Sequence, residues 1–371
     1  MATKKYEKKE SRDYQQELNN KIIGILEEAE QNLDKGLKWE MPFFKCNERP
    51  INGFTGERYN GANVMALMVE GYDDPRWMTF KQMEEKSKQI GKPLHLEKGS
   101  KAAYVMKVVP VYEKEEVWVE APGGKKTKEE IVKKDSSGKP MPVRDEHGNP
   151  KISFKWYPVF NASQIVGMEP YMKRETTEEV KPHEAVEMLS MALQERTGLR
   201  VEHSARGQAY YSPSEHLVHM PKPELFKSAD HYADTALHEY GHSTGKALGR
   251  DLTGQFGSAL YAKEELVAEL TSCYMAMELG VHHNPSTHEN QAAYIKSWLK
   301  ALKDDKTLIT KAASQASKAT EYLVGHYEAY KQELAQKNEN RVTQAEDMAK
   351  DLIANLTKKP AQNKPTKALT M

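Results

Sequence analysis

The stretch "DTALHEYGHSTG", Asp234–Gly245, decides how the second half of the chain folds and what it can bind. His238 and His242 bracket Glu239 in it, in the pattern HExxH. Residues four apart share one face of an α-helix, so both imidazoles can reach one metal ion. Glu239 lies one step around the helix, where its carboxylate can take a proton from a metal-bound water. The pattern indicates a metal site; the alternative is a pair of partly exposed helix histidines.

The surrounding residues set the limits of this helix and exclude one class of zinc site. Ser228 or Asp230 can cap its start, and Gly245 is a suitable stop. The longer metzincin pattern needs a histidine at position 248, where this chain has Leu248. A third ligand must therefore come from elsewhere in the sequence, and a glutamate on a later helix is typical of His₂Glu sites.

The run "YAKEELVAELTSCYMAMELG" is strongly helical and offers three glutamates. Glu265 and Glu269 are four apart and share a face beside an apolar seam, whereas Glu264 points about 100° away. We predict Glu265 as the third ligand and Glu269 as the group that holds a ligand histidine from behind. The reverse assignment stays open, as does an ordinary solvated acidic face. Upstream side chains that could polarise a substrate carbonyl are Tyr210, Tyr211, His203, His216 and His219.

Composition places the chain among globular proteins of roughly two domains, since it has 371 residues. No run of about 18 apolar residues occurs, which excludes a membrane-spanning helix. The first residues are charged and lack the apolar core of a secretory signal. With only two cysteines, a disulfide framework is not expected, and we expect a cytoplasmic protein. The formal net charge of zero gives no support to nucleic-acid binding by bulk charge.

Periodicity along the chain predicts an α+β fold of two domains. Helical spacing over 13–33 and alternation over 102–112 and 154–165 predict an α+β N-terminal domain. After it we expect a mostly helical domain with a small sheet. The predicted limits are 1–170 for the first domain, with a hairpin insertion at 121–152, then 171–336 for the second domain and 337–371 for a charged, partly disordered tail.

The first domain combines basic and aromatic residues around a glycine-rich stretch. Binding of single strands needs cations for phosphates and aromatic rings on which bases stack. The candidate DNA-binding residues are Arg49, Asn52, Arg58, Tyr59, Asn63, Arg76, Trp77, Lys98 and Lys101. Phe80 is a further candidate stacking platform, although Trp77 and Phe80 suit a small core equally well.

Two blocks of sequence resemble the ArdC-type antirestriction proteins of mobile elements, over most of residues 13 to 325. The first block includes "PINGFTGERYNGANVMAL", "PRWMTFKQ" and "YPVFNASQIVG", and the second "YADTALHEYGHSTG" and "AKEELVAEL". The resemblance implies an N-terminal domain that binds single-stranded DNA with little sequence preference. It also implies a C-terminal zincin-like metallopeptidase domain, whose ligands would be His238, His242 and a glutamate of "EELVAEL".

We therefore expect a plasmid or phage antirestriction protein that binds single-stranded DNA and carries a zinc-dependent metallopeptidase-type domain, with Mn²⁺ as the alternative metal. One alternative is a metalloprotease that mainly cleaves a host or self protein and uses DNA only for targeting. Another is a catalytically silent domain with a structural metal. A protein substrate is expected but not identified, and no membrane partner is expected. A monomer is the default, since no heptads or extended apolar stripe demand oligomerisation.

Overall fold

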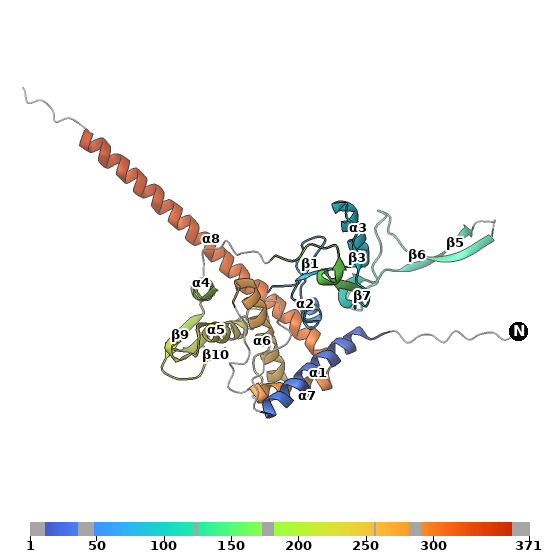
Figure 1. Ribbon diagram of the computed structural model, residues 1–371, viewed down its shortest axis with the longest axis horizontal. Coiled ribbons are helices and arrows are strands. Elements are labelled where there is room, and N and C mark those ends of the chain that lie inside the picture. Colours follow the sequence, from blue (N-terminus) through green and yellow to red (C-terminus); the bar gives the residue numbers. More distant parts are fainter. Residues whose placement is uncertain are drawn as a thin grey trace, which may run out of the picture.

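The computed structural model describes residues 12–35, 48–121, 125–172, 182–255, 257–281 and 291–357. Figure 1 shows a central body from which a two-stranded hairpin and a long helix project in different directions. The main sheet lies in the N-terminal part, and the C-terminal part is helical with one small sheet. The predicted α+β architecture is thereby confirmed.

The N-terminal sheet has the strand order β1-β2-β7-β4. Its strands are β1 (Ile51–Asn52), β2 (Arg76–Met78), β7 (Ile152–Asn161) and β4 (Ala103–Pro110). Two helices of the N-terminal part are α2 (Ala62–Met68) and α3 (Phe80–Ile90). A separate two-stranded sheet pairs β3 (His95–Leu96) with β8 (Ile165–Val166), and β8 directly follows the short helix η2 (Ala162–Gln164). Trp77, Leu67, Val105 and Val159 form the small core of this sheet.

The projecting hairpin consists of β5 (Lys114–Ala121) and β6 (Lys125–Val132), paired antiparallel from Lys114↔Val132 to Ala121↔Lys125. It begins at Lys114, earlier than the insertion expected at 121–152. Charged and apolar residues alternate in β5, and this pattern also suits a two-stranded ribbon that is exposed on both faces. Two tight turns follow it. In each, an aspartate, Asp135 or Asp145, accepts backbone hydrogen bonds from the residues two and four positions later.

Five helices share one apolar core that crosses the expected boundary between the two domains. They are α1 (Tyr14–Asp34), α2, α6 (Ala259–Leu279), α7 (Gln291–Asp304) and α8 (Leu308–Thr357). Ile22 of α1 and Met65 of α2 lie in this core with Leu270 of α6 and Ile309 of α8. The N-terminal sheet is therefore attached, through α2, to the helix that carries the candidate third ligand.

A second core packs the small sheet against α5 (Ala229–Ser243). The sheet has the order β10-β11-β9, in which β10 (Tyr210–Ser212) is an edge strand antiparallel to β11 (Leu217–Pro221). β9 (Arg200–Ser204) follows α4 (Pro182–Thr197) and is parallel to β11, and the short helix η3 (Pro223–Leu225) leads into α5. Met220 of β11 and Tyr240 of α5 are completely buried between these elements.

The helix α8 is continuous over 50 residues and shows no break at the expected boundary of 336. Every side chain from 335 to 353 is exposed, so this last part leaves the body and projects alone (Figure 1). The tail expected to be partly disordered is thus helical as far as Thr357, and residues 358–371 lie outside the described residues. Among the described helices, none combines the length and apolarity that crossing a bilayer would need.

Candidate metal centre

The HExxH helix α5 is fixed at its start and pressed against α6 near its end. The Ser228 hydroxyl accepts a hydrogen bond of 3.1 Å from the His231 amide, which confirms the predicted cap. A Cβ at Gly241 would lie 3.2 Å from the Cα and the carbonyl oxygen of Ala268 on α6. The helices can approach this closely only because position 241 is glycine. This contact brings the two histidines opposite "EELVAEL".

Glu265 faces both histidines. One carboxylate oxygen lies 3.4 Å from Nε2 of His238, and the other 3.6 Å from Nε2 of His242. Both separations exceed those of most N–H···O hydrogen bonds. They match the ~3.4 Å between two ligands placed ~2.1 Å from a tetrahedral ion. The three potential ligand atoms lie within 4.8 Å of one another. These residues therefore fit a divalent metal, and the geometry favours Glu265 over Glu269 as the third ligand.

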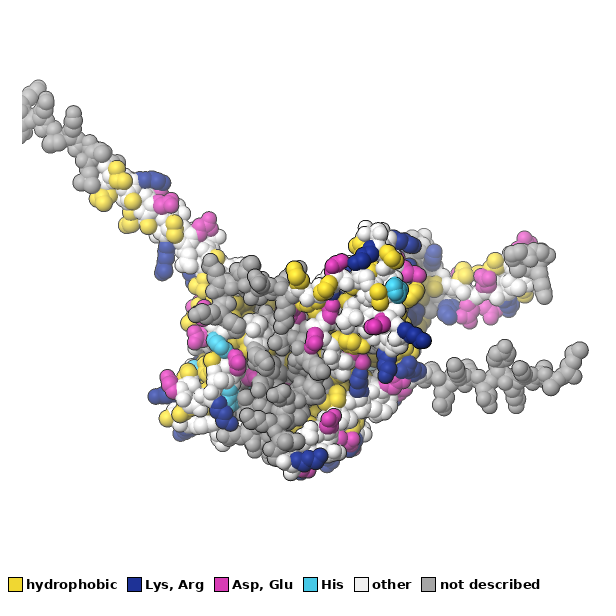
Figure 2. Space-filling view, in the orientation of Figure 1, with side chains coloured by type: hydrophobic (Ala, Val, Ile, Leu, Met, Phe, Trp, Pro, Cys, Tyr) yellow, Lys and Arg dark blue, Asp and Glu magenta, His cyan; other side chains and the backbone are white. Residues whose placement is uncertain are grey.

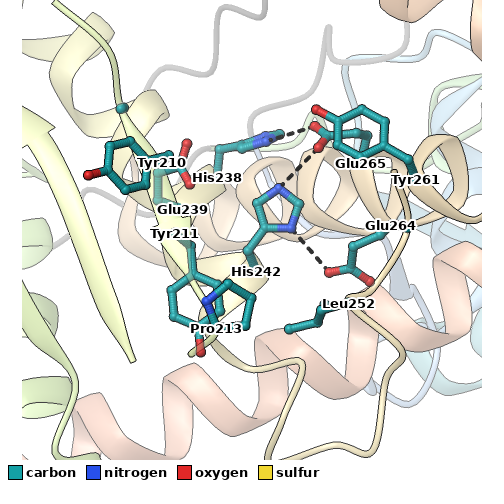
Figure 3. A pocket seen from close by; sticks show the side chains of 12 residues that line it. Tyr210, Tyr211, Pro213, His238, Glu239, His242, Leu252, Tyr261, Glu264 and Glu265 are labelled. Carbon is teal, nitrogen blue, oxygen red and sulfur yellow. Dashed lines mark hydrogen bonds and ion pairs between the residues drawn. The ribbon is translucent and has the colours of Figure 1, made fainter. Parts of the chain in front are cut away.

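A second carboxylate lies behind each imidazole. Nδ1 of His238 lies 3.2 Å from Glu269, and Nδ1 of His242 lies 3.1 Å from Glu264. Figure 3 shows His242 between Glu264 and Glu265, with one ring nitrogen directed at each. Carboxylates in this position fix the orientation of a ligand histidine and increase its basicity. Each ring is thereby held with Nε2 directed at Glu265.

Glu264 and Arg250 are functional candidates that the sequence did not indicate. The Arg250 guanidinium donates to both carboxylate oxygens of Glu264, at 3.0 and 2.9 Å, and to the Gly241 carbonyl at 2.8 Å. Its other terminal nitrogen, Nη1, donates to the Thr244 hydroxyl at 2.7 Å. Spacing along α6 directs Glu264 away from Glu265, and Arg250 comes from a loop. No periodic pattern could therefore have connected them with His242.

The buried carboxylates control the protonation of both histidines. Burial by itself lowers the pKa of His238, but hydrogen bonding to Glu265 and Glu269 outweighs burial and leaves this pKa well above its ordinary value. Burial likewise lowers the pKa of His242, while Glu265 and Glu264 raise it to about 9. The pKa of Glu265 is raised by burial, yet the two imidazoles hold it well below its usual range. A metal entering this site would displace protons from the histidines.

A pocket of about 270 Å³ opens over the histidines. Glu239 lines it and is 8% exposed. The edge strand β10 contributes Tyr210 and Tyr211, and α6 contributes Tyr261, on the opposite side in Figure 3. Of the side chains predicted as carbonyl-polarising groups, only these two β10 tyrosines are among the lining residues.

The structure contradicts two of the predicted DNA contacts in the glycine-rich block. Trp77 is 2% exposed, because it fills the core of the small sheet, and its ring has no face free for a base. The side chain of Arg49 is 8% exposed and lies 2.9 Å from Glu278 of α6. It also donates to the carbonyl of Tyr59. Both residues join parts of the body together, so these predictions were wrong.

Three further candidates are used within the chain. The side-chain oxygen Oδ1 of Asn52 closes a turn by accepting hydrogen bonds from the backbone amides of Phe54 and Thr55. The Asn63 side-chain amide donates to the Met106 carbonyl on β4 and accepts from the Met106 backbone N–H. Arg76 is held by Asp74. All three side chains thus hold the chain itself together, and a DNA contact by any of them stays a prediction.

The other predicted contacts remain open as proposals. Lys98 and Lys101 are exposed, as is Arg58, although Arg58 also pairs with Glu278. Tyr59 is half-buried, and burial raises its pKa to about 12.

An aromatic face that the sequence analysis did not single out lies on the outer side of β4 and β7. The ring of Tyr104 lies 4.3 Å from that of Tyr14 on α1, and Trp156 lies 5.6 Å from Tyr14. Arg12 lies over the Tyr104 ring at 4.8 Å, and Phe154, on the same side of β7 as Trp156, is 53% exposed. Alternation in "FKWYP" is the signal that could have revealed it.

Two family models match separate parts of the chain. Residues 12–141 match the N-terminal domain of the anti-restriction factor ArdC, and residues 189–315 match a zincin-like metallopeptidase. An uncharacterized protein of Sinorhizobium fredii, y4eC, is 30% identical over 299 residues, which cover 79% of this chain and 84% of that protein. Two Escherichia coli proteins named DNA primase TraC are each 38% identical over 279 and 295 residues, but this chain spans only 24% and 18% of their length.

Solved structures agree with the family models. The metal-free crystal structure of the antirestriction ArdC protein from the R388 plasmid has a TM-score of 0.59 to this chain at 29% identity. The match covers 86% of this chain and 99% of that protein. A Mn(II)-bound structure of the same protein matches with the same TM-score. The similarity therefore extends across both parts of the fold.

Proposed function

This chain belongs to the ArdC antirestriction family, and we propose that it binds single-stranded DNA with little sequence preference and cleaves a peptide bond at a metal site formed by His238, His242 and Glu265. Membership supports the pairing of an ArdC N-terminal domain with a zincin-like domain. The finer roles rest on the chemistry of two surfaces. They are the aromatic face of β4 and β7 and the pocket above the HExxH helix.

The observation that supports DNA binding is the aromatic face. Phe154 is exposed, the half-buried rings of Trp156 and Tyr104 follow it along the same side of the sheet, and Arg12 lies next to Tyr104. Base stacking on such rings contributes about 1–3 kcal/mol per base and is tolerant of sequence. Lys107 and Lys155 are paired on the opposite face of the same two strands, so Arg12 is the cation that lies next to the rings and can contact a phosphate.

The pocket supports peptide hydrolysis. A divalent metal bound there would act as a Lewis acid and lower the pKa of water. The Glu239 carboxylate borders the same pocket and can hold the proton that water loses. Tyr210 and Tyr261 can place hydroxyl groups near a developing oxyanion, and the edge strand β10 can align an extended peptide. Zn²⁺ and Mn²⁺ both suit the donor set of two imidazoles and one carboxylate.

DNA binding is tested by fluorescence anisotropy with a labelled single strand over a series of salt concentrations. Phe154→Ala should weaken binding about 5- to 100-fold, as expected for the loss of one stacking platform. Phe80→Ala is the comparison, because Phe80 is the alternative stacking platform and is 52% exposed on α3, compared with 53% for Phe154. Equal losses of DNA affinity at both positions would argue against the aromatic face as the specific stacking surface. Affinity that does not fall with rising salt would argue against phosphate binding altogether.

Peptidase activity is tested with metal-loaded protein and a quenched fluorescent peptide library. Glu239→Gln should reduce cleavage by about 10²–10⁴-fold while the protein keeps its metal, because it removes the base and no ligand. If wild-type protein with stoichiometric metal cleaves nothing, and His242→Ala lowers thermal stability without affecting DNA binding, the metal is structural and the domain is catalytically silent.

A further inference from the structure

The projecting end of α8 carries an exposed apolar stripe. Val342 is 58% exposed, Met348 75% and Leu352 62%, and Figure 2 shows hydrophobic side chains recurring along this segment. Within the described residues, no side chain between 335 and 353 is covered by another element. An isolated soluble helix normally hides such a stripe, so the exposure calls for a partner.

The spacing of the stripe identifies the kind of partner. Val342, Ala345, Ala349 and Leu352 follow one another at intervals of three, four and three residues. Contrary to the expectation that the chain has no heptads, these residues occupy the a and d positions of a short heptad repeat, and the sequence places Leu356 at the next a position. Over these two heptads the spacing fits the a/d seam of a left-handed two-stranded coiled coil.

We propose that residues 335–356 of α8 pair in parallel with the same residues of a second copy of this chain, forming a short two-stranded coiled coil.

The charges beside the stripe favour a parallel, self-complementary pairing. In the repeat, Arg341 takes a g position and Glu346 the following e position. In a parallel dimer, g faces the e position five residues later on the other helix, so Arg341 meets Glu346 twice by symmetry. The next such pair joins Met348 to Ile353, both apolar and exposed in the single chain. An antiparallel arrangement would instead place each charge opposite an apolar residue.

The architecture allows this pairing without disturbing the rest of the fold. The exposed segment extends about 30 Å beyond the body, since each helical residue rises about 1.5 Å. Its earlier turns are buried from Leu308 to Tyr330, so the costly nucleation of the helix is already complete. The apolar seam of this interface, from Val342 to Leu356, spans barely more than two heptads, and the dimer is therefore reversible and concentration-dependent.

The polar face of the segment disfavours a membrane surface as the occupant. Over 337–357 it carries Lys337, Arg341 and Lys350 against Glu339, Glu346, Asp347 and Asp351, three positive charges against four negative. Helices that bind anionic lipid surfaces have polar faces rich in lysine and arginine. The pairing is independent of the DNA and metal roles proposed above, because α8 beyond residue 335 contributes to neither surface.

Sedimentation velocity of the full chain over a concentration series tests the dimer. We expect a reversible monomer–dimer equilibrium. Leu352→Asp should raise its dissociation constant at least about tenfold, because it places a charge in the apolar seam. Gln344→Asp is the matched control at a c position on the outer face and should leave the equilibrium unchanged. A wild-type chain that stays monomeric at all concentrations, or that binds anionic vesicles instead, would overturn the proposal.

A charge exchange tests the parallel register and does not depend on a buried substitution. Arg341→Glu and Glu346→Arg should each weaken self-association, since each creates two like-charge pairs. An equimolar mixture of the two variants should form a heterodimer at least as stable as the wild-type dimer, because every g–e pair is again of opposite sign. A mixture that associates no better than either variant alone would overturn the parallel arrangement.

Discussion

The helix pair α5–α6 and the glycine-rich block at 49–63 were both rich in candidate functional residues, yet they differ in what those residues do. On α5 and α6 the predicted histidines and glutamate converge on one point. In the block, Arg49, Asn52 and Asn63 use their hydrogen-bonding groups to hold the chain itself together. Fixed spacing on a helix determines where side chains meet, whereas residue types gathered in a loop do not.

Removing a ligand should give the largest effect and would show that the convergence on α5–α6 is functional. His242→Ala should weaken metal binding by about 3–4 kcal/mol, or several hundredfold, because a structural zinc site contributes about 10–16 kcal/mol over four ligands. Glu239→Gln should keep its metal. Competition against a chromophoric chelator measures both affinities. If His242→Ala binds metal as tightly as the wild type, the site lies elsewhere.

Removing Arg49 should show that the glycine-rich block is structural. Arg49→Ala should destabilise the fold by about 3 kcal/mol, since it leaves Glu278 and the carbonyl of Tyr59 without their buried partner. Arg58→Ala is the control, because it removes the other partner of Glu278 at a side chain that is 60% exposed. It should cost less than about 1 kcal/mol. Urea denaturation measures the free energy of unfolding of both variants. Equal losses would contradict a structural role that is specific to the buried Arg49.

Replacing Glu264 should have a smaller effect on the same metal site. Glu264→Gln keeps the size of the side chain but removes the negative charge that orients His242 and binds Arg250. We expect metal affinity to fall about 10- to 100-fold, as for other groups that hold ligand histidines. Thermal unfolding of the metal-free variant serves as the check on folding. Unchanged affinity in a folded variant would mean that Glu264 only anchors the loop of Arg250.

Metal affinity should depend on pH through the raised pKa of His242. In the metal-free protein this pKa is about 9, so a proton must leave before metal binds at neutral pH. Affinity should therefore fall by up to about tenfold per pH unit for each such histidine as pH drops below 9. The stability of the metal-free fold changes with pH in the opposite direction. A pKa raised from 6.5 to about 9 stabilises the fold below pH 6.5, and this stability is lost as pH rises through 9. Calorimetry in buffers of different ionisation enthalpy counts the released protons, and no proton release at pH 7 would contradict the shift.

Sequence periodicity predicted the α+β architecture and the face shared by Glu265 and Glu269, because both follow from the repeat of a helix or strand. It could not distinguish the core role of Trp77 from base stacking, since burial depends on strands that are far apart in sequence. The contacts of Glu264 with Arg250 were missed for the same reason. They depend on how the loop after α5 folds back across α6.

The aromatic face also depends on contacts between residues that are far apart in sequence. Phe154 and Trp156 alternate within one strand, but Tyr14 reaches Trp156, and Arg12 reaches Tyr104, only because α1 packs beside the sheet. The structure likewise shows no break at the boundary expected at 336, because helix-forming residues continue across it and α8 does not end there.

The most direct test of the convergence on α5–α6 is anomalous diffraction from crystals soaked with Zn²⁺ or Mn²⁺. We expect one peak in the pocket, about 2.0–2.2 Å from Nε2 of His238, Nε2 of His242 and a carboxylate oxygen of Glu265. Glu269 should remain hydrogen-bonded to Nδ1 of His238. A peak bound by Glu269 with Glu265 turned away, or no peak between the two histidines, would contradict the metal site described here.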